Sequence, residues 1–383
     1  MEASWWKDLS QLDDEQKKVI ALGDDSDHLV TGPPGCGKTN LLLLRATYLH
    51  KKGTLNIKVL SFGRVLKEFI VAGTVNYPFA SDKVQTLVRW GYEVLHANGF
   101  SIEESDDFDL VRDQIFEKLA EIADLNKAEN VYDVILLDEA QDYSGKEIAV
   151  IRRFCDRLFA VGDDNQRITD RIGGIEKLEE LGVTKVVLHH HYRNGFKICR
   201  VADGIKNLID DPKSMEATCN YDEANYPSKV EVIGGIALSQ QVSEAVERIK
   251  TQLQAYPGEM IGVLCPRAED LSVVSKLLLA SEIADEVQIQ RAGAYAAIAA
   301  GRPVLLTTVP GAKGLEFRAV HMMAADKLKR FQTQRNLTYT AVTRAKTTLN
   351  VYHDENLAGY FEKGLNACKK PSSGEPNLKD LFL

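Results

Sequence analysis

The sequence predicts an α/β protein whose strands form parallel sheets. Apolar runs of strand length alternate with segments of helical periodicity along most of the chain, which is the pattern of strands joined by crossover helices. A glycine-rich turn follows the first of these runs and precedes an apolar helix. The chain has 383 residues, which is enough for two or three domains.

Composition and charge exclude several classes of protein. The chain is 44% hydrophobic and 27% charged, as in globular proteins rather than disordered chains or disulfide scaffolds. Its net charge of −8 excludes a basic surface over the whole molecule, so a nucleic-acid site would be a local groove. The longest uncharged run, residues 69–81, is shorter than the ~20 residues of a membrane span, and we expect no membrane association.

The cysteines indicate the cellular compartment of the protein. Its six cysteines form no C-x-x-C pair, so we expect reduced thiols in a cytoplasmic protein rather than a zinc site or a disulfide framework. Three consecutive histidines begin at His189. Neighbouring side chains on a strand point to opposite faces, so we expect no shared metal ion and one ring that faces solvent.

Eight segments have the length and apolar character of strands, and the charged stretch from Asp210 to Ser228 is expected to be a surface loop. The predicted strands are His28–Thr31, Lys58–Ser61, Val134–Leu137, Leu158–Val161, Lys185–Leu188, Met260–Cys265, Pro303–Thr308 and Ala319–Met323.

The first strand leads into a phosphate-binding loop. Thr31 is followed by Gly-Pro-Pro-Gly-Cys-Gly-Lys-Thr and then by an apolar helix, which is the G-x-x-x-x-G-K-T motif in the context that it requires. We expect Lys38 to reach the β- and γ-phosphates of ATP and the Thr39 hydroxyl to bind Mg²⁺. Backbone N–H groups of the loop would hold phosphate oxygens. The predicted ATP-binding segment is Gly32, Pro33, Pro34, Gly35, Cys36, Gly37, Lys38, Thr39 and Asn40.

Two adjacent carboxylates, Asp138 and Glu139, follow the predicted strand Val134–Leu137. Ligands of α/β proteins bind at the carboxyl ends of parallel strands. We therefore expect Asp138 to hold Mg²⁺, directly or through water, and Glu139 to orient and deprotonate the attacking water.

The order of the motifs resembles that of superfamily 1 helicases of the UvrD/Rep/PcrA type. Asp138-Glu-Ala-Gln-Asp142 resembles the second motif of that family, and the resemblance spans about residues 9 to 352. The other matching segments, in the family's order, are Leu12–Gln16, Val59–Arg64, Val84–Trp90, Ala160–Gln166, Leu188–Arg193, Gly311–Phe317 and Thr338–Lys346.

This resemblance implies two RecA-like P-loop NTPase domains that clasp ATP and Mg²⁺. The first would be residues 1–180, with a small helical insert at about 88–130. The second would be residues 181–366, followed by a flexible tail at 367–383. The first domain is implied to supply Lys38, Thr39, Asp138, Glu139 and the γ-phosphate sensor Gln166, with Gln16 at the adenine edge. The second would supply Tyr192, stacked on adenine, with Arg193, Gly314, Glu316 and Arg344.

The sequence departs from the family in three places. Between Leu279 and Val304 there is no room for the family's large second-domain insert. The segment after Gln166 lacks the usual aromatic residue and has Arg171 nearby, which would either stack on a base or lie in solvent as a loop charge. Pro310 stands where the family commonly has His. The residues that we expect at single-stranded nucleic acid are Ser61, Phe62, Arg64, Thr86 and Arg171.

The expected function is an ATP- and Mg²⁺-dependent motor on single-stranded nucleic acid, with DNA as the expected polymer. An alternative is a nucleic-acid-sensing ATPase that switches a partner, such as a nuclease in phage defence or DNA repair, with little unwinding of its own. A nucleoside or small-molecule kinase would not explain Gln166, Arg193 and Arg344 in helicase order. The ending Asp380-Leu-Phe resembles sliding-clamp-binding peptides but lacks their leading Gln, and a packed or disordered tail is favoured.

Overall fold

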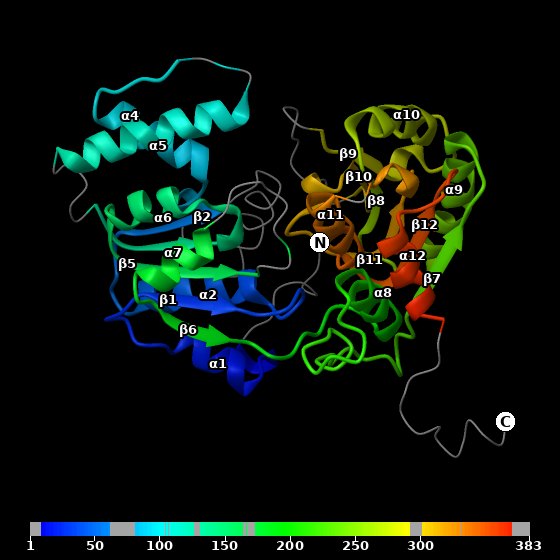
Figure 1. The fold of residues 1–383 in the computed structure, drawn as a ribbon, viewed down its shortest axis with the longest axis horizontal. Helices are drawn as coiled ribbons and strands as arrows, with labels where there is room; N and C mark the ends of the chain where they lie inside the picture. Colours follow the sequence, from blue (N-terminus) through cyan, green and yellow to red (C-terminus); the bar gives the residue numbers. More distant parts are fainter. Residues whose placement is uncertain are drawn as a thin grey trace.

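The computed structural model describes residues 9–61, 81–103, 105, 107–125, 131–163, 166, 173–291, 301–329 and 331–369. Its strands form two six-stranded sheets in which every pair is parallel. The two sheets and their helices lie side by side (Figure 1). The predicted fold class, α/β with two parallel-sheet domains of the RecA-like kind, is therefore confirmed.

The first sheet has the strand order β3-β2-β4-β5-β1-β6. Its strands are β1 (His28–Thr31), β2 (Ile57–Ser61), β3 (Val84–Thr86), β4 (Tyr132–Leu137), β5 (Cys155–Gly162) and β6 (Thr184–Val187). The helices that connect them are α1 (Asp14–Ile20), α2 (Lys38–Lys51), α4 (Leu87–Ala97), α5 (Phe108–Asp124), α6 (Gly145–Arg152) and α7 (Gly174–Glu180).

The second sheet has the order β7-β12-β11-β8-β10-β9. Its strands are β7 (Lys229–Ile233), β8 (Ile261–Cys265), β9 (Val287–Ile289), β10 (Val304–Thr308), β11 (Phe317–Met322) and β12 (Ala345–Tyr352). Its helices are α8 (Phe196–Lys206), α9 (Leu238–Ala255), α10 (Ala268–Leu279), α11 (Gln332–Val342) and α12 (Gly359–Ala367).

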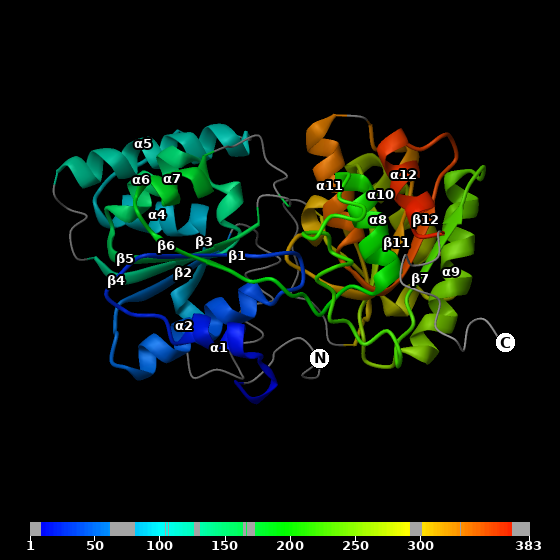
Figure 2. The same ribbon diagram turned by 60° about the horizontal axis from the view of Figure 1, so that its bottom comes forward.

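Helices cover both faces of each sheet, which explains why the strands are continuous apolar runs. In β1, Val30 packs in the cluster that holds the apolar face of α2, whereas its neighbour Leu29 packs in the cluster formed with α4 to α7. Figure 2 shows α1 and α2 on one side of the first sheet and α4 to α7 on the other. Adjacent side chains on a strand point in opposite directions, so both must be apolar here.

Strand register brings the motif loops together at one edge of the first sheet. Thr31 at the end of β1 lies opposite Gly162 at the end of β5, and Leu137 at the end of β4 lies opposite Ala160. The loops that follow β1, β4 and β5 therefore leave the sheet at the same edge. This edge is where open parallel sheets bind ligands.

The predicted helical insert is present as α4 and α5, which lie above the first sheet in Figure 1. Within the described residues between Leu279 and Val304, only a 3₁₀ turn and the short strand β9 are present. No described helix has the length and apolar character needed to cross a bilayer. The tail from residue 370 onward, with its Asp380-Leu-Phe ending, lies outside the described residues.

Some details differ from the sequence prediction. Strands β3, β7, β9 and β12 were not predicted. Strand β6 pairs with β1, so the first sheet extends to Val187, beyond the domain boundary predicted at residue 180. Since the chain leaves the strand at Val187, the three histidines are not on it, and two rings rather than one are exposed: His189 and His190.

Candidate functional site

A cavity of about 640 Å³, open solvent at its mouth included, lies between loops of the two sheets. All the described residues that line it were predicted to bind or hydrolyse ATP or to hold Mg²⁺. From the first half of the chain these are Gly35, Gly37, Lys38, Thr39, Asn40, Asp138, Glu139 and Gln166, and from the second half Arg193, Gly314, Glu316 and Arg344. The fold thus brings together residues as far apart in the sequence as Gly35 and Arg344.

The phosphate loop has the backbone that its glycines permit. Gly35 and Gly37 have φ angles of 79° and 88°, in the left-handed region that favours glycine. A Cβ on Gly35 would lie 2.5 Å from the Cβ of Arg193, so glycine also allows the loop to touch the second-domain segment. Lys38 begins α2, and its Nζ donates to the carbonyls of Gly32 at 2.7 Å and Pro33 at 3.0 Å.

Oxygen ligands suited to Mg²⁺ lie beside the phosphate loop. The Thr39 hydroxyl donates to Asp138 Oδ2 at 3.0 Å. Burial and the neighbouring charge of Glu139 raise the pKa of Asp138 to about 7. A buried carboxylate next to a hydroxyl is a donor set that a hard divalent cation prefers. These two residues therefore fit the magnesium that the fold implies.

Glu139 has an uncommon backbone conformation. Its φ of 54° and ψ of 47° place a non-glycine residue in the left-handed region, which costs free energy and is typical of functional sites. Gln141 Nε2 donates to Glu139 Oε2 at 2.5 Å. Burial opposes ionisation, but the positive charges of Lys313, Arg344 and Lys38 hold the pKa of Glu139 below its ordinary value. The side chain is therefore a carboxylate that can accept a proton.

Lys313 is a site residue that the sequence analysis did not select. It is 7% exposed, and its Nζ donates to the Asp142 carboxylate and to the carbonyl of Gln166 at 3.1 Å. The same Nζ lies 3.8 Å from Glu139 Oε2. The available signal was its place in Gly311–Phe317, the motif that also supplied Gly314 and Glu316.

Gln166 and Arg344 connect the two halves of the site. Gln166 Nε2 donates to Asp163 Oδ2 at 2.9 Å, and the Arg344 guanidinium donates to Gln166 Oε1. Arg344 also donates to the carbonyls of Leu315 and Thr340, each at 3.1 Å. Burial and the nearby charge of Arg193 lower the pKa of Arg344 to about 10, so it remains a cation at neutral pH.

Glu316 pairs with two cations through its two oxygens. Arg193 Nε donates to Oε2 at 2.6 Å, and Lys346 Nζ lies 2.7 Å from Oε1. Burial alone would raise the pKa of Glu316, but the charges of Lys346 and Arg193 lower it to about 2. Glu316 thus holds Arg193 at the wall of the cavity.

The residues predicted at adenine lie beside the phosphate loop. Gln16 is buried, and its Nε2 donates to the carbonyl of Cys36 at 3.0 Å. Tyr192 donates its backbone N–H to the carbonyl of Gly35 at 3.2 Å and its hydroxyl to Asp13. Asp13 also accepts from the backbone N–H of Gln16 at 2.8 Å, so Asp13 links these two residues. Their roles at adenine remain predictions.

The expected nucleic-acid residues are less clearly grouped. Ser61 is fully buried at the end of β2, so in this conformation its side chain offers no surface to a polynucleotide. Thr86 is partly buried, and its hydroxyl accepts from the Arg89 N–H at 3.4 Å as the cap of α4. Phe62, Arg64 and Arg171 lie outside the described residues.

Two family models match the chain. The AAA domain model matches residues 16–170, and the model of the UvrD-like helicase C-terminal domain matches residues 303–352. The fold and the two matches indicate a P-loop protein of helicase type. Residues 303–352 are thus similar to UvrD-like helicases, as the motif order of the sequence also predicted. A search of curated proteins found no match.

Two solved structures illustrate the similarity. The PRRSV helicase is 15% identical with a TM-score of 0.42, and the match covers 88% of this chain and 54% of the viral chain. This chain thus spans about half the length of that relative. The C-terminal domain of a possible DNA helicase from Lactobacillus plantarum is 20% identical with a TM-score of 0.34, and the match covers 46% of this chain and 96% of that one.

Proposed function

We propose that this protein is a motor of the UvrD-like helicase class that depends on ATP and Mg²⁺. It hydrolyses ATP between its two RecA-like domains and moves on or grips single-stranded nucleic acid, with DNA as the expected polymer. The observation that carries this proposal is the set of residues that line one cavity. One cavity holds the phosphate loop, two adjacent carboxylates, and arginines from the opposite half of the molecule.

The chain's own residues account for hydrolysis. Lys38 exchanges the carbonyls of Gly32 and Pro33 for the β- and γ-phosphates. Thr39 and Asp138 would hold Mg²⁺, which neutralises phosphate charge when bound. Glu139 accepts a proton from the water whose oxygen attacks the γ-phosphorus, and ADP leaves with the electrons of the broken P–O bond. Arg193 and Arg344 donate to the transferred phosphoryl oxygens.

Closure of the two domains is the step that couples this reaction to movement. Arg344 contacts Gln166, and Lys313 contacts Asp142, so both second-domain cations touch first-domain motifs only when the domains are together. Guanidinium groups that arrive on closure contribute about 10³–10⁵ to the rate in related phosphoryl transfers. Nucleic acid that favours the closed form would therefore raise ATP turnover.

The test is ATP turnover of the purified full chain with and without single-stranded DNA and RNA oligonucleotides. We expect stimulation by single strands in the wild type. Glu139→Gln should bind ATP with similar affinity and lose hydrolysis, because the proton acceptor is lost while size is kept. As a surface control, Glu121→Gln should behave as the wild type, because Glu121 is half-exposed and pairs with Lys118 on the surface of α5.

Two results would reject the proposal. Turnover by Glu139→Gln at the wild-type rate would exclude Glu139 as the base. An ATPase that ignores every polynucleotide would exclude the nucleic-acid motor. It would favour an ATPase gated by a protein partner, such as one that supplies specificity or nuclease activity.

A further inference from the structure

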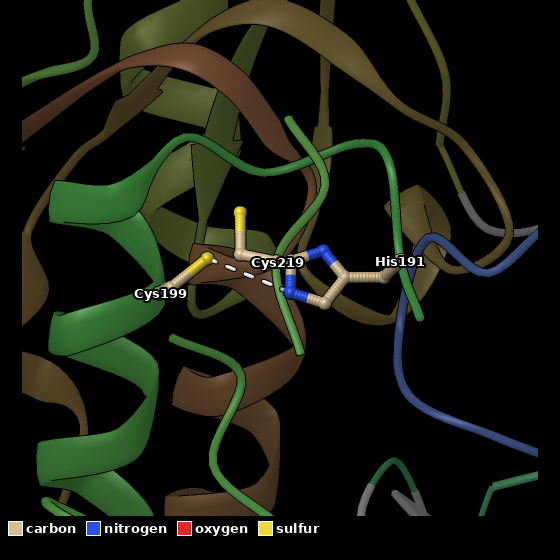
Figure 3. Close-up of side chains that lie close together, drawn as sticks. All are labelled: His191, Cys199 and Cys219. Atoms are coloured by element: carbon tan, nitrogen blue, oxygen red, sulfur yellow. Dashed lines mark hydrogen bonds between the residues drawn. The ribbon is translucent and has the colours of Figure 1, made fainter. Parts of the chain in front are cut away.

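Three potential soft-metal ligands converge next to the nucleotide site. His191 lies after β6, Cys199 is in α8, and Cys219 is in the loop before β7. One potential ligand atom from each of the three lies within 4.8 Å of the others. Figure 3 shows the Cys199 thiol pointing toward the imidazole ring, with the Cys219 side chain beside both. His191 and Cys219 also form an isolated parallel bridge, so the backbone itself holds these segments together.

Each of the three side chains contacts a backbone carbonyl, and one ring nitrogen of His191 is left over. His191 and Cys199 are fully buried, and Cys219 is partly buried. His191 Nε2 lies 2.7 Å from the carbonyl of Met215 and 3.7 Å from Cys199 Sγ. Within the described part of the chain, its buried Nδ1 has no hydrogen-bond partner. Both thiols point to one acceptor, the carbonyl of Asn194, at 3.3 Å each.

The chemistry of this cluster suits a thiophilic ion. His191 is buried, which favours the neutral imidazole. Its Nε2 faces the Met215 carbonyl, which can only accept a hydrogen bond, so binding of a metal through Nε2 would move that proton to Nδ1. One imidazole and two thiols form a nitrogen and sulfur set that prefers Zn²⁺ or Cu⁺ over Mg²⁺ or Ca²⁺. The cluster contains no carboxylate ligand, which also disfavours the hard cations.

We propose that His191, Cys199 and Cys219 bind one Zn²⁺ ion, with a backbone carbonyl or water in the fourth position. Binding converts both thiols to thiolates and releases their protons to solvent. The carbonyls of Met215 and Asn194 already contact the cluster. This proposal does not depend on ATP hydrolysis, because the ligands are separate from the residues that line the cavity.

The position of the cluster indicates what the ion would do. His191 directly precedes Tyr192 and Arg193, and Arg193 lines the cavity. A bound ion would tie this segment to α8 and to the loop that holds Cys219. The ion would thus be structural, and it would hold Arg193 in place relative to the rest of the second domain.

The test uses the reduced, full-length protein after its metal has been removed with a chelator. Zinc is titrated in competition with a chromophoric chelator, and we expect one tightly bound ion. Cys199→Ser and Cys219→Ser should each weaken binding by more than about tenfold, because even outer-shell changes cost 10- to 100-fold. The affinity should rise with pH, since both thiols must lose protons.

Two other cysteines provide matched controls. Cys265 in β8 is buried like Cys199, and Cys368 is partly buried like Cys219, and neither belongs to the cluster. Cys265→Ser and Cys368→Ser should keep wild-type zinc affinity. Cobalt bound to the wild type should show strong thiolate-to-metal charge-transfer absorption, and a single Ser substitution in the cluster should weaken it.

The proposal fails if reduced wild-type protein binds no zinc, or if all four Ser variants bind it equally. Formation of a Cys199–Cys219 disulfide on mild oxidation, in a protein that binds no zinc when reduced, would also reject the proposal. If the cluster variants do not fold, the number of zinc ions bound by the wild type and the absorption spectrum of its cobalt complex test the proposal. A cobalt complex without thiolate absorption would then reject the site.

Discussion

Lys313 shows how a single cation organises the acidic part of the site. Its ammonium group lies among the carboxylates of Asp142 and Glu139 and the carbonyl of Gln166, all from the first half of the chain. Burial opposes its charge, but Asp142 and Glu139 raise the pKa of Lys313 above its ordinary value. Removing it would leave two buried carboxylates without their shared counter-ion.

We therefore predict that Lys313→Ala lowers kcat by about 10²-fold, as loss of a preorganised charge does, with a smaller effect on ATP affinity. The reason is that Lys313 contacts Asp142 and lies 3.8 Å from Glu139, the proposed base. Lys313→Arg should recover part of the rate because the charge is kept. Steady-state ATPase and nucleotide-binding titrations measure both quantities. Lys177→Ala, on the surface of α7, is the control, and equal loss in both variants would contradict this role.

His321 determines part of the pH dependence of stability. It is fully buried in β11, where Nδ1 lies 3.0 Å from the Tyr352 hydroxyl and Nε2 lies 2.8 Å from Gln252 Oε1. Burial lowers the pKa of His321 to about 3. Because the unfolded chain takes up this proton below about pH 6.5 and the fold does not, the fold is favoured above pH 6.5 and loses stability as the pH falls toward 3.

From this shift we predict that acidification from pH 7.5 to 5.5 lowers the free energy of unfolding of the wild type by about 1.4 kcal/mol more than that of His321→Gln. The comparison uses the change with pH for each protein, so a constant effect of the substitution cancels. Urea unfolding at several pH values measures it. His96→Gln, in the last turn of α4, is a histidine control that should keep the wild-type slope. Identical slopes for wild type and His321→Gln would refute the prediction.

At the scale of elements, a buried ion pair ties α5 to α6 and to the turn that follows Glu139. Arg112 in α5 contacts Glu147 in α6 through Nε at 2.5 Å and Nη2 at 2.7 Å. The same Nη2 donates to the carbonyl of Asp142 at 3.1 Å. Both side chains are at most 2% exposed. This arrangement connects α5 directly to the turn that follows Glu139.

Breaking this pair should be costly. Arg112→Ala removes the buried cation that pairs with the buried Glu147 carboxylate, so we expect the free energy of unfolding to fall by about 3–5 kcal/mol. Arg89→Ala removes the exposed pair with Glu93 on α4 and should cost less than about 1 kcal/mol. Urea unfolding compares the two. Equal small losses would show that the Arg112–Glu147 pair is not the main anchor of α5.

The same scale shows what the sequence could and could not predict. The central strands β1, β4, β5, β8, β10 and β11 are apolar runs because helices cover both of their faces, and they were predicted. Strand β12 is buried over its whole length but contains Thr347, Thr348 and Asn350. These polar residues interrupt the apolar run by which a strand is recognised in a sequence, so β12 was not predicted. The edge strand β7 is partly exposed, and β3 and β9 have only three residues each.

The residues of the candidate site also fall into those that the sequence could predict and those that it could not. Residues in contiguous motifs, such as Lys38 and Glu139, were selected because the motif itself specifies the chemistry. The pairing of Lys313 with Asp142 spans 171 positions, and only the meeting of the two domains creates it. The cluster of His191, Cys199 and Cys219 has no regular spacing, so sequence inspection favoured unassigned thiols and excluded zinc on that ground.

For the whole molecule, an acidic chain with a small insert should bind nucleic acid modestly. The net charge is −8, and only a few phosphates would be neutralised along a short path over both domains. We predict that affinity for single-stranded DNA falls with salt, with a log–log slope of about −0.7 for each phosphate contact. ATP should change this affinity because it changes domain closure. Fluorescence anisotropy over a salt series measures both effects, and a salt-independent affinity would contradict them.

The same architecture predicts weak unwinding by the isolated protein. The described residues between Leu279 and Val304 contain no accessory insert that could grip the duplex ahead of the motor. A helicase assay with a long duplex should give little strand separation under conditions in which single strands stimulate ATPase. A purified monomer that separates long duplexes efficiently would overturn this prediction.

Glu316 has one further consequence for the cycle. In the proposed reaction its carboxylate and the γ-phosphate compete for the guanidinium of Arg193. In the structure Arg193 Nε lies 2.6 Å from Glu316 Oε2. We expect the γ-phosphate of ATP to draw Arg193 away from Glu316 in this reaction, whereas ADP has no phosphate at that position. In the proposed reaction, loss of the γ-phosphate therefore returns Arg193 to Glu316. The second domain would then lose its contact with the bound nucleotide and release ADP. Loss of the γ-phosphate alone would thus be enough to reopen the site.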